Sequence, residues 1–338
     1  MTVLSPILEH VASYGWDQNR PPVDARRVDG LVSMLRQKKV TGLAVASWKA
    51  GDLLLDPEQE ADLAAVQAGL AAVALEIDSL TLRTLDEFGA DRMIVLKGIV
   101  HAHLDYPDPS WREYGDVDLL VASDRLRDVE LWFESLGFSR SFEPFGWRWE
   151  QQFGKSITLR SHRLEVDLHR GLSQGLALGV DVATLFERRS TFVHAGVEVP
   201  TLDSAARLVH AAVHAMGGSE TPPLTGLIDI AHMASDPGRL EAAVRLAMQW
   251  DVSLTLADGV QAAAERVGGI QPKELATVAG LRGSANERVR RRILDRPGHG
   301  FRNDLLAGFV SLRGVRRRAR FVASLVADRT VPTPSRRP

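Results

Sequence analysis

The hydrophobic period of the chain changes twice along its length, and this limits the folds it can adopt. In residues 1–90 and 201–328, apolar residues recur at spacings of three and four, as in amphipathic helices. Between them, residues 91–200 carry short apolar runs and alternating segments typical of strands. The sequence therefore predicts an α+β fold, with a small mixed sheet flanked by N-terminal and C-terminal helical regions. The last residues, 329–338, are expected to be disordered.

The longest helix is expected to follow Asp56. An apolar stripe continues from Leu63 to Phe88, Pro57 suits the first helical position, and Gly89 suits the stop. Such a helix spans roughly 48 Å at 1.5 Å per residue and is long enough to brace a neighbouring domain. No run of 18 apolar residues occurs, so no transmembrane helix is expected.

Shorter elements are expected in the other two regions. In the middle region, strands are predicted at 93–96, 117–121, from 138 onward, and at 147–153, 156–159 and 164–169, with a helix at 124–136. In the last region, helices are predicted at 205–216, with Asp203 as N-cap, and near 223–235, 238–250, 253–267, 285–295 and 313–327.

Amino-acid composition and charge exclude several classes of site and partner. The chain has no cysteine, which excludes disulfides, cysteine zinc sites and a thiol nucleophile. The formal net charge of −2 gives no whole-chain evidence for a nucleic-acid or membrane partner. Residues 1–19 lack a basic stretch followed by an apolar core, so no signal peptide is predicted. We therefore expect a cytoplasmic protein with no membrane partner.

Two aspartates open the predicted strand at 117–121. Asp116 and Asp118 are two residues apart, so they lie on the same face of an extended strand. Like charges held that close repel each other unless a cation lies between them, and carboxylate oxygens suit Mg²⁺. In dehalogenase-type and glycosyltransferase sites the apolar strand precedes the aspartates. Here it follows them, which argues against both of those classes.

A second polar face follows at 164–169. Alternation places Glu165, Asp167 and His169 on the same side of this strand, followed by Arg170. Asp167 could therefore complete a metal site with the two earlier aspartates. Three carboxylates on adjacent strands can hold two Mg²⁺ ions, which clamp the attacking and leaving oxygens of a phosphoryl displacement.

Lys97 and Gly98 form the third candidate site, between a strand and a short helix. Glycine at this point lets the backbone approach a phosphate, and the N-terminus of the next helix offers N–H donors.

Taken in order, these blocks resemble the uncharacterised nucleotidyltransferase family of the DNA polymerase beta-like superfamily. The resemblance covers roughly residues 25–270. The matching blocks are Leu96-Lys97-Gly98, Arg112-x-x-Gly115-Asp116-x-Asp118-Leu119-Leu120-Val121, Glu165-Val166-Asp167-Leu168-His169, and the helical segments 208–215 and 227–230.

The resemblance implies transfer of a nucleoside monophosphate from a triphosphate such as ATP. By motif, Asp116 and Asp118 would bind Mg²⁺, with two ions expected and Mn²⁺ as a substitute. Asp167 would bind metal or act as base for the acceptor hydroxyl. The nucleotide would be bound by Lys97, Gly98, Arg112 and Gly115. His169, Arg170 and Glu165 would contact the acceptor or support the metal ligands.

Where the wider superfamily has Gly-Ser or Gly-Gly after the first strand, this chain has Lys97-Gly98, so Lys97 or Arg112 would supply charge to the triphosphate. Arg112 could instead anchor its loop by pairing with Glu113 or Asp116.

The acceptor is left open by the sequence. A small molecule is the first choice, and a tRNA or protein acceptor, as in toxin-like nucleotidyltransferases, is the alternative. A non-catalytic nucleotide-binding regulatory module is the third possibility.

Two further patterns have simpler interpretations. His210 and His214 have the i, i+4 spacing of a zinc pair, but no cysteine or His-Glu-x-x-His motif accompanies them. We therefore expect core histidines, with a hydrogen bond to Asp229. The aromatic residues at 145, 147, 149 and 153 could stack on a base, but core packing is the expected role.

The C-terminal segment is strongly basic. Residues 282–338 contain 15 Arg and 4 acidic residues, a net charge of +11, whereas residues 1–281 carry −13. These arginines are expected to contact the acidic body of the protein, with phosphate or RNA as the alternative.

Overall fold

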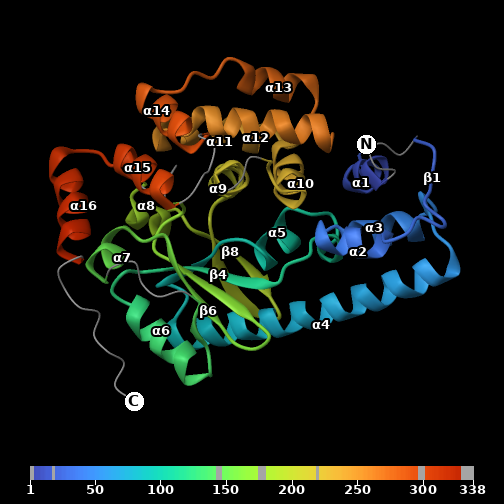
Figure 1. The fold of residues 1–338 in the computed structure, drawn as a ribbon, viewed down its shortest axis with the longest axis horizontal. Coiled ribbons are helices and arrows are strands. Elements are labelled where there is room, and N and C mark those ends of the chain that lie inside the picture. The colour runs from blue at the N-terminus through green and yellow to red at the C-terminus, as the bar shows by residue number, and fades with distance from the viewer. Residues whose placement is uncertain are drawn as a thin grey trace.

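A seven-stranded mixed sheet lies at the centre of the structure, with helices on both faces (Figure 1). The computed structural model describes residues 4–16, 20–141, 147–173, 180–217, 221–295 and 301–328. The strands are β3 (Met93–Val95), β4 (Asp116–Val121), β5 (Ser139–Arg140), β6 (Ser156–Arg160), β7 (Glu165–His169), β8 (Ser190–His194) and β9 (Val197–Thr201). The α+β prediction is confirmed.

The strand order, β5-β6-β7-β4-β3-β9-β8, puts the two predicted carboxylate strands side by side. β4 and β7 are parallel, while β3 pairs antiparallel with β4 and β6 antiparallel with β7. β8 and β9 form a hairpin at the other edge, next to β3. The aspartates of β4 therefore lie at the centre of the sheet and not at an edge.

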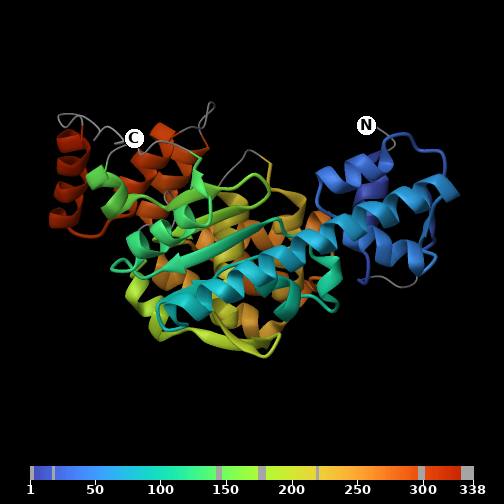
Figure 2. The ribbon, with the colours of Figure 1, turned by 90° about the horizontal axis from the view of Figure 1, so that it is seen from below.

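Helix α4 (Pro57–Phe88) is the predicted long helix. Its N-cap Asp56 accepts hydrogen bonds from the amides of Glu58 and Gln59, and the Gln59 side chain accepts one from the Asp56 amide. This capping box fixes the start, and Gly89, with a φ of +83°, ends the helix. Figure 2 shows α4 running from the N-terminal helices to the sheet, as a brace would.

By length and composition alone, α4 could span a membrane, which the sequence-based expectation did not anticipate. Core helices of globular proteins that are mostly buried meet the same criterion, but only 22% of the apolar window of α4 is buried. In this fold, Ile77, Leu80 and Leu85 of α4 are buried in the cluster formed with β3, β4 and α6 (Leu126–Ser135).

The remaining helices cover the other face of the sheet and both ends of the fold. At the N-terminus, α1 (Leu4–Ala12), α2 (Leu31–Gln37) and α3 (Thr41–Lys49) flank the short parallel pair β1 (Val23–Asp24) and β2 (Leu53–Leu54). The later helices are α5 (Ile99–Leu104), the 3₁₀ turn Pro109–Trp111, α8 (Val182–Glu187), α9 (Ser204–Met216), α10 (Leu224–Ala234), α11 (Pro237–Trp250), α12 (Ser253–Arg266), α13 (Pro272–Ala279), α14 (Ala285–Leu294), α15 (Phe301–Ser311) and α16 (Val315–Asp328).

One hydrophobic cluster joins the N-terminal and C-terminal helical regions. Leu35 of α2 and Leu43 of α3 belong to the same buried cluster as Leu208 of α9 and Ile230 of α10. Ile94 of β3 lies in this cluster too, whereas its neighbours Met93 and Val95 lie in the cluster with α4. The alternation of side chains along β3 therefore separates the two cores.

One predicted strand is wrong: residues 147–153 form helix α7 (Trp147–Phe153). Trp149 and Phe153 are four residues apart, which places them on one helical face. Both pack edge-on against Phe321 of α16. Trp149 and Phe153 therefore have the expected packing role, whereas Phe145 and the side chain of Trp147 lie outside the part of the chain that is described.

Part of the basic segment contacts the acidic body, as expected. Arg290 of α14 lies 2.8 Å from Asp251, at the end of α11, and Arg291 pairs with Asp258 of α12. Residues 329–338, predicted to be disordered, lie outside the described residues.

Candidate active site

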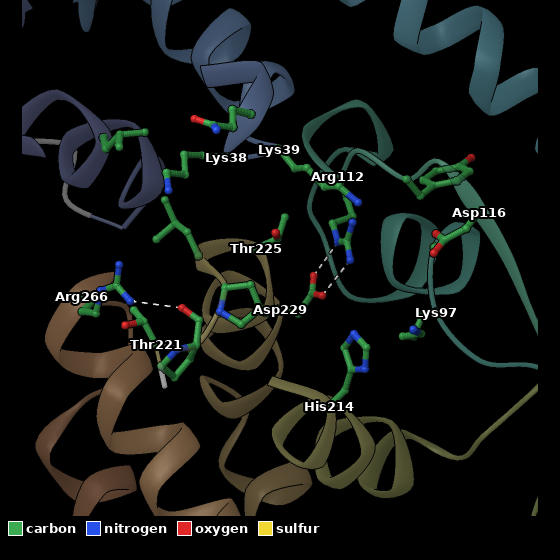
Figure 3. Close-up of a pocket in the computed structure, with 18 of the residues that line it drawn as sticks. Lys38, Lys39, Lys97, Arg112, Asp116, His214, Thr221, Thr225, Asp229 and Arg266 are labelled. Carbon is green, nitrogen blue, oxygen red and sulfur yellow. Dashed lines mark hydrogen bonds and ion pairs between the residues drawn. The ribbon is translucent and has the colours of Figure 1, made fainter. Parts of the chain in front are cut away.

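A cavity of about 480 Å³ opens beside the start of β4, between the sheet, α2, α10 and α12 (Figure 3). Its lining includes five of the predicted nucleotide or metal residues: Lys97, Gly98, Arg112, Asp116 and Asp118. The volume is within the range of small-molecule sites.

The register of two parallel strands brings the predicted carboxylates together. Asp118 of β4 is paired directly with Asp167 of β7, and Asp116 with Glu165. Asp118, Asp167 and His169 each place one ligand atom within 4.8 Å of the others. This group contains two of the three predicted metal ligands, Asp118 and Asp167, and Asp116 lies outside it.

Asp118 is held by two nitrogen groups. Lys97 Nζ lies 2.9 Å and His169 Nε2 lies 2.7 Å from the same Oδ1 atom. Burial opposes ionisation of Asp118, but Lys97 and His169 outweigh it and hold its pKa well below the usual range. Burial also lowers the pKa of His169, which favours the neutral imidazole. Asp118 is therefore a carboxylate, oriented by residues the sequence had also singled out.

Asp116 has the opposite electrostatic environment. Burial first, and then the charge of Asp118, raise its pKa. Within the described residues its carboxylate has no hydrogen bond or ion pair, although Lys97 and Lys39 are close enough to lower its pKa in part. A half-buried carboxylate without a partner, beside a second one, fits a cation ligand.

The donor set fits Mg²⁺. Asp116 and Asp118 offer hard oxygen atoms, as Mg²⁺ prefers. Asp167 offers a third carboxylate, oriented by a hydrogen bond from the Thr158 hydroxyl.

Gly98 requires glycine for a backbone reason. Its φ is +54°, a conformation that L side chains rarely adopt. A Cβ atom there would lie 3.4 Å from the Tyr114 side chain, an ordinary van der Waals contact, so the backbone conformation and not the available space demands glycine. The turn from β3 into α5 therefore brings bare backbone to the cavity wall, as predicted.

Arg112 is an anchor with a partner the sequence did not predict. Its Nε and Nη2 atoms lie 2.7 and 2.9 Å from the two carboxylate oxygens of Asp229, on α10. The third contact is Nη1 to the carbonyl of Glu113. The alternative role as a loop anchor therefore named the wrong partners, Glu113 or Asp116, and most of the guanidinium donors are occupied by Asp229.

Asp229 also corrects the expectation for the paired histidines. Among the described residues it accepts hydrogen bonds from Tyr106 Oη at 2.8 Å and from Arg112, and neither His210 nor His214 bonds to it. His210 is buried, and its Nδ1 has no partner among the described residues. His214, by contrast, lines the cavity (Figure 3), where burial and then Lys97 lower its pKa to about 3.

Three other predicted residues lie elsewhere. Glu165 forms a partly exposed pair with Arg160, and Arg170 donates to the carbonyl of Glu150, which ties β7 to α7. Neither lines the cavity. Gly115 precedes Asp116, with nothing within 4 Å of a Cβ placed on it.

Several cationic side chains at the site were missed. Lys38 and Lys39, between α2 and α3, reach the cavity from one side, and Arg266 of α12 reaches it from another (Figure 3). Lys155 lies near Asp118 and Asp167, and burial followed by Lys97 lowers its pKa. A lysine pair in a surface turn has no local signature of function, so only the fold reveals these contacts.

One pH effect is expected near this network. His232 of α10 packs between Trp16 and Tyr106, and burial lowers its pKa to about 4. The unfolded chain therefore binds this proton more readily, so stability present above about pH 6.5 is lost as the pH falls towards 4.

Between about pH 7 and pH 5, we expect the free energy of unfolding to fall by about 2 kcal/mol more in the parent than in the His232→Gln variant. Urea denaturation at both pH values measures this. Equal losses in the two proteins would contradict it, and the exposed-site variant His162→Gln serves as control.

Comparison with known proteins adds a family. A family model described as "Uncharacterised nucleotidyltransferase" matches residues 24–268. Among solved structures, the chain is similar to an antigenic nucleotidyltransferase-like protein from Paracoccidioides brasiliensis. The identity is 15% and the TM-score 0.35, with 63% of this chain and 94% of the other covered. No curated protein matches the chain.

Proposed function

Since the chain belongs to the uncharacterised nucleotidyltransferase family, we propose that it moves a nucleoside monophosphate from a nucleoside triphosphate to a hydroxyl acceptor. The acceptor oxygen forms a bond to the α-phosphorus, the bond from that phosphorus to the bridging oxygen breaks, and pyrophosphate leaves. The observation that carries the proposal is the pairing of Asp118 with Asp167 across parallel strands, beside a cavity that Asp116 also lines.

The proposed roles of the carboxylates and of His169 follow from their positions in the site. Asp116 and Asp118 are the proposed ligands of Mg²⁺, with Asp167 as third ligand or as base for the acceptor proton. Bound Mg²⁺, or Mn²⁺ in its place, supplies charge neutralisation at the phosphates. His169 holds Asp118 in place through the 2.7 Å contact.

The cations around the cavity support a triphosphate substrate such as ATP. Lys38, Lys39 and Arg266 converge on it from two helical segments, and Gly98 leaves room for phosphate at the backbone. Arg112 contributes positive potential, although its donors are held by Asp229.

Lys39 offers a first test of this assignment. We expect Lys39→Ala to raise KM for the nucleotide about 10-fold with little change in kcat, because an exposed lysine that contacts phosphate contributes to binding throughout the reaction. Steady-state kinetics checks this. Lys49→Ala, an exposed lysine at the end of α3, is the matched control. An unchanged KM would remove Lys39 from the phosphate site.

The activity itself is tested with Mg²⁺ and each labelled triphosphate, with pyrophosphate release and label transfer as readouts. The Asp116→Ala/Asp118→Ala protein is the control. No nucleotide binding, or equal turnover in the double variant, would reject the proposal. Binding without turnover over a broad acceptor panel would favour the regulatory module.

We propose a small molecule as the acceptor, because all residues that line the cavity lie within residues 1–281, whose net charge of −13 disfavours a polyanionic RNA acceptor. A tRNA acceptor predicts a different salt response, since RNA binding weakens steeply with salt and small-molecule transfer does not. Label transfer to tRNA with a steep salt dependence would therefore replace the small molecule by RNA, and label on a protein would identify a protein acceptor.

A further inference from the structure

A second cluster of metal-ligating side chains lies outside the cavity. It consists of Asp78 from α4, His103 from α5 and His194 from β8, elements far apart in sequence (Figure 1). One ligand atom from each residue lies within 4.8 Å of the others. The proposed transfer reaction uses none of the three.

Asp78 is buried and has only uncharged or weakly basic donors. Tyr114 Oη donates to Oδ1 at 2.9 Å, and His194 Nε2 lies 3.0 Å from Oδ2. In the described part of the chain, no lysine or arginine pairs with this carboxylate. Because a buried charge is costly without a counter-charge, either an imidazolium or a bound cation must balance it.

His103 packs beside His194 and Phe192. Its ring centre lies 4.5 Å from that of His194 and 6.2 Å from that of Phe192, on which it stacks. Neither ring nitrogen is hydrogen-bonded within the residues that the structure describes. A ring nitrogen of His103 is therefore available to a metal ion that also contacts Asp78 and His194.

We propose that Asp78, His103 and His194 bind a divalent transition metal, with Zn²⁺ as the best fit. Two imidazole nitrogens and one carboxylate oxygen form a zinc donor set that leaves a fourth position for water. Ligands of a tetrahedral zinc ion lie roughly 3.3 Å apart, so the observed group needs only small side-chain adjustments. Binding replaces the hydrogen bond between His194 and Asp78.

Tyr114 connects this site to the cavity. It orients Asp78 through its hydroxyl, as outer-shell partners of metal ligands do. Its ring lines the cavity next to Gly98. A metal at Asp78 would therefore fix α4, α5 and β8 around one wall of the cavity.

Cobalt substitution tests the site independently of transfer activity. We expect metal-stripped full-length protein to bind one equivalent of Co²⁺ with the visible absorption of a tetrahedral nitrogen-containing site. His103→Ala and His194→Ala are each expected to weaken this binding at least about 10-fold. His162→Ala, an exposed histidine in the turn between β6 and β7, is the matched control and keeps the signal.

The Asp118→Asn/Asp167→Asn variant separates the two clusters, because it disables the carboxylates of the cavity and must retain the signal. Loss of the signal in that variant, or its persistence in both histidine variants, would overturn the proposal. So would the absence of tetrahedral Co²⁺ absorption in the parent. Should an alanine variant fail to fold by circular dichroism, Asp78→Asn and His194→Gln provide the same comparison, and Zn²⁺ must raise the Tm of the parent but not of these variants.

Discussion

The Asp118→Asn variant is expected to lose nucleotidyl transfer by about 10³-fold. Asparagine keeps the size of the side chain but removes the charge that Lys97 and His169 now hold at 2.9 and 2.7 Å. A metal contributes several kcal/mol of charge stabilisation in phosphoryl displacement, and about 1.4 kcal/mol corresponds to a factor of 10 in rate. Label transfer from the triphosphate under single-turnover conditions measures the loss.

Two controls make this result specific. Asp124→Asn changes an exposed carboxylate shortly after the same strand and must retain full activity. The Tm of both variants must be recorded, because the substitution at Asp118 removes the ion-pair partner of Lys97, whose side chain is nearly buried. A folded Asp118→Asn protein with activity within about threefold of the parent would exclude Asp118 as a metal ligand.

The second large effect concerns stability. We expect Asp229→Ala to lower the free energy of unfolding by about 3–5 kcal/mol, because it leaves the Arg112 guanidinium buried without its partner. Tyr106 loses its acceptor at the same time. Burial disfavours the charge of Arg112, and Asp229, followed by Tyr106 and Asp116, raises its pKa. Urea denaturation at neutral pH measures the change.

The matched control is Asp124→Ala, which breaks an exposed pair with Arg92 and is expected to cost less than about 1 kcal/mol. Adding Arg112→Leu to Asp229→Ala must recover part of the loss, because it removes the unpaired charge. Equal losses in Asp229→Ala and Asp124→Ala would show that the buried pair contributes little to the fold.

The helix that replaced a predicted strand shows where local patterns fail. Over residues 147–153, tryptophans two residues apart suggest alternation, while Trp149 and Phe153 are four apart and suggest a helix. Both periods fit so short a segment. The helix places both rings against Phe321, a contact that the segment alone does not encode.

The α+β pattern, the long capped helix and the polar faces of two strands could be predicted from the amino-acid sequence alone. Each of these depends on residues within one or two turns, so a period of two or 3.6 is enough to predict them. Asp116 and Asp118 share a face for this reason alone.

The residues that contact those polar faces depend on the tertiary structure. The pairing of Asp118 with Asp167, the contact between Arg112 and Asp229 117 positions away, and the approach of Lys39 depend on how separate elements pack. Local periodicity says which side of an element is polar. Burial of apolar surface over the whole chain determines which elements pack against each other, and this packing forms the cavity.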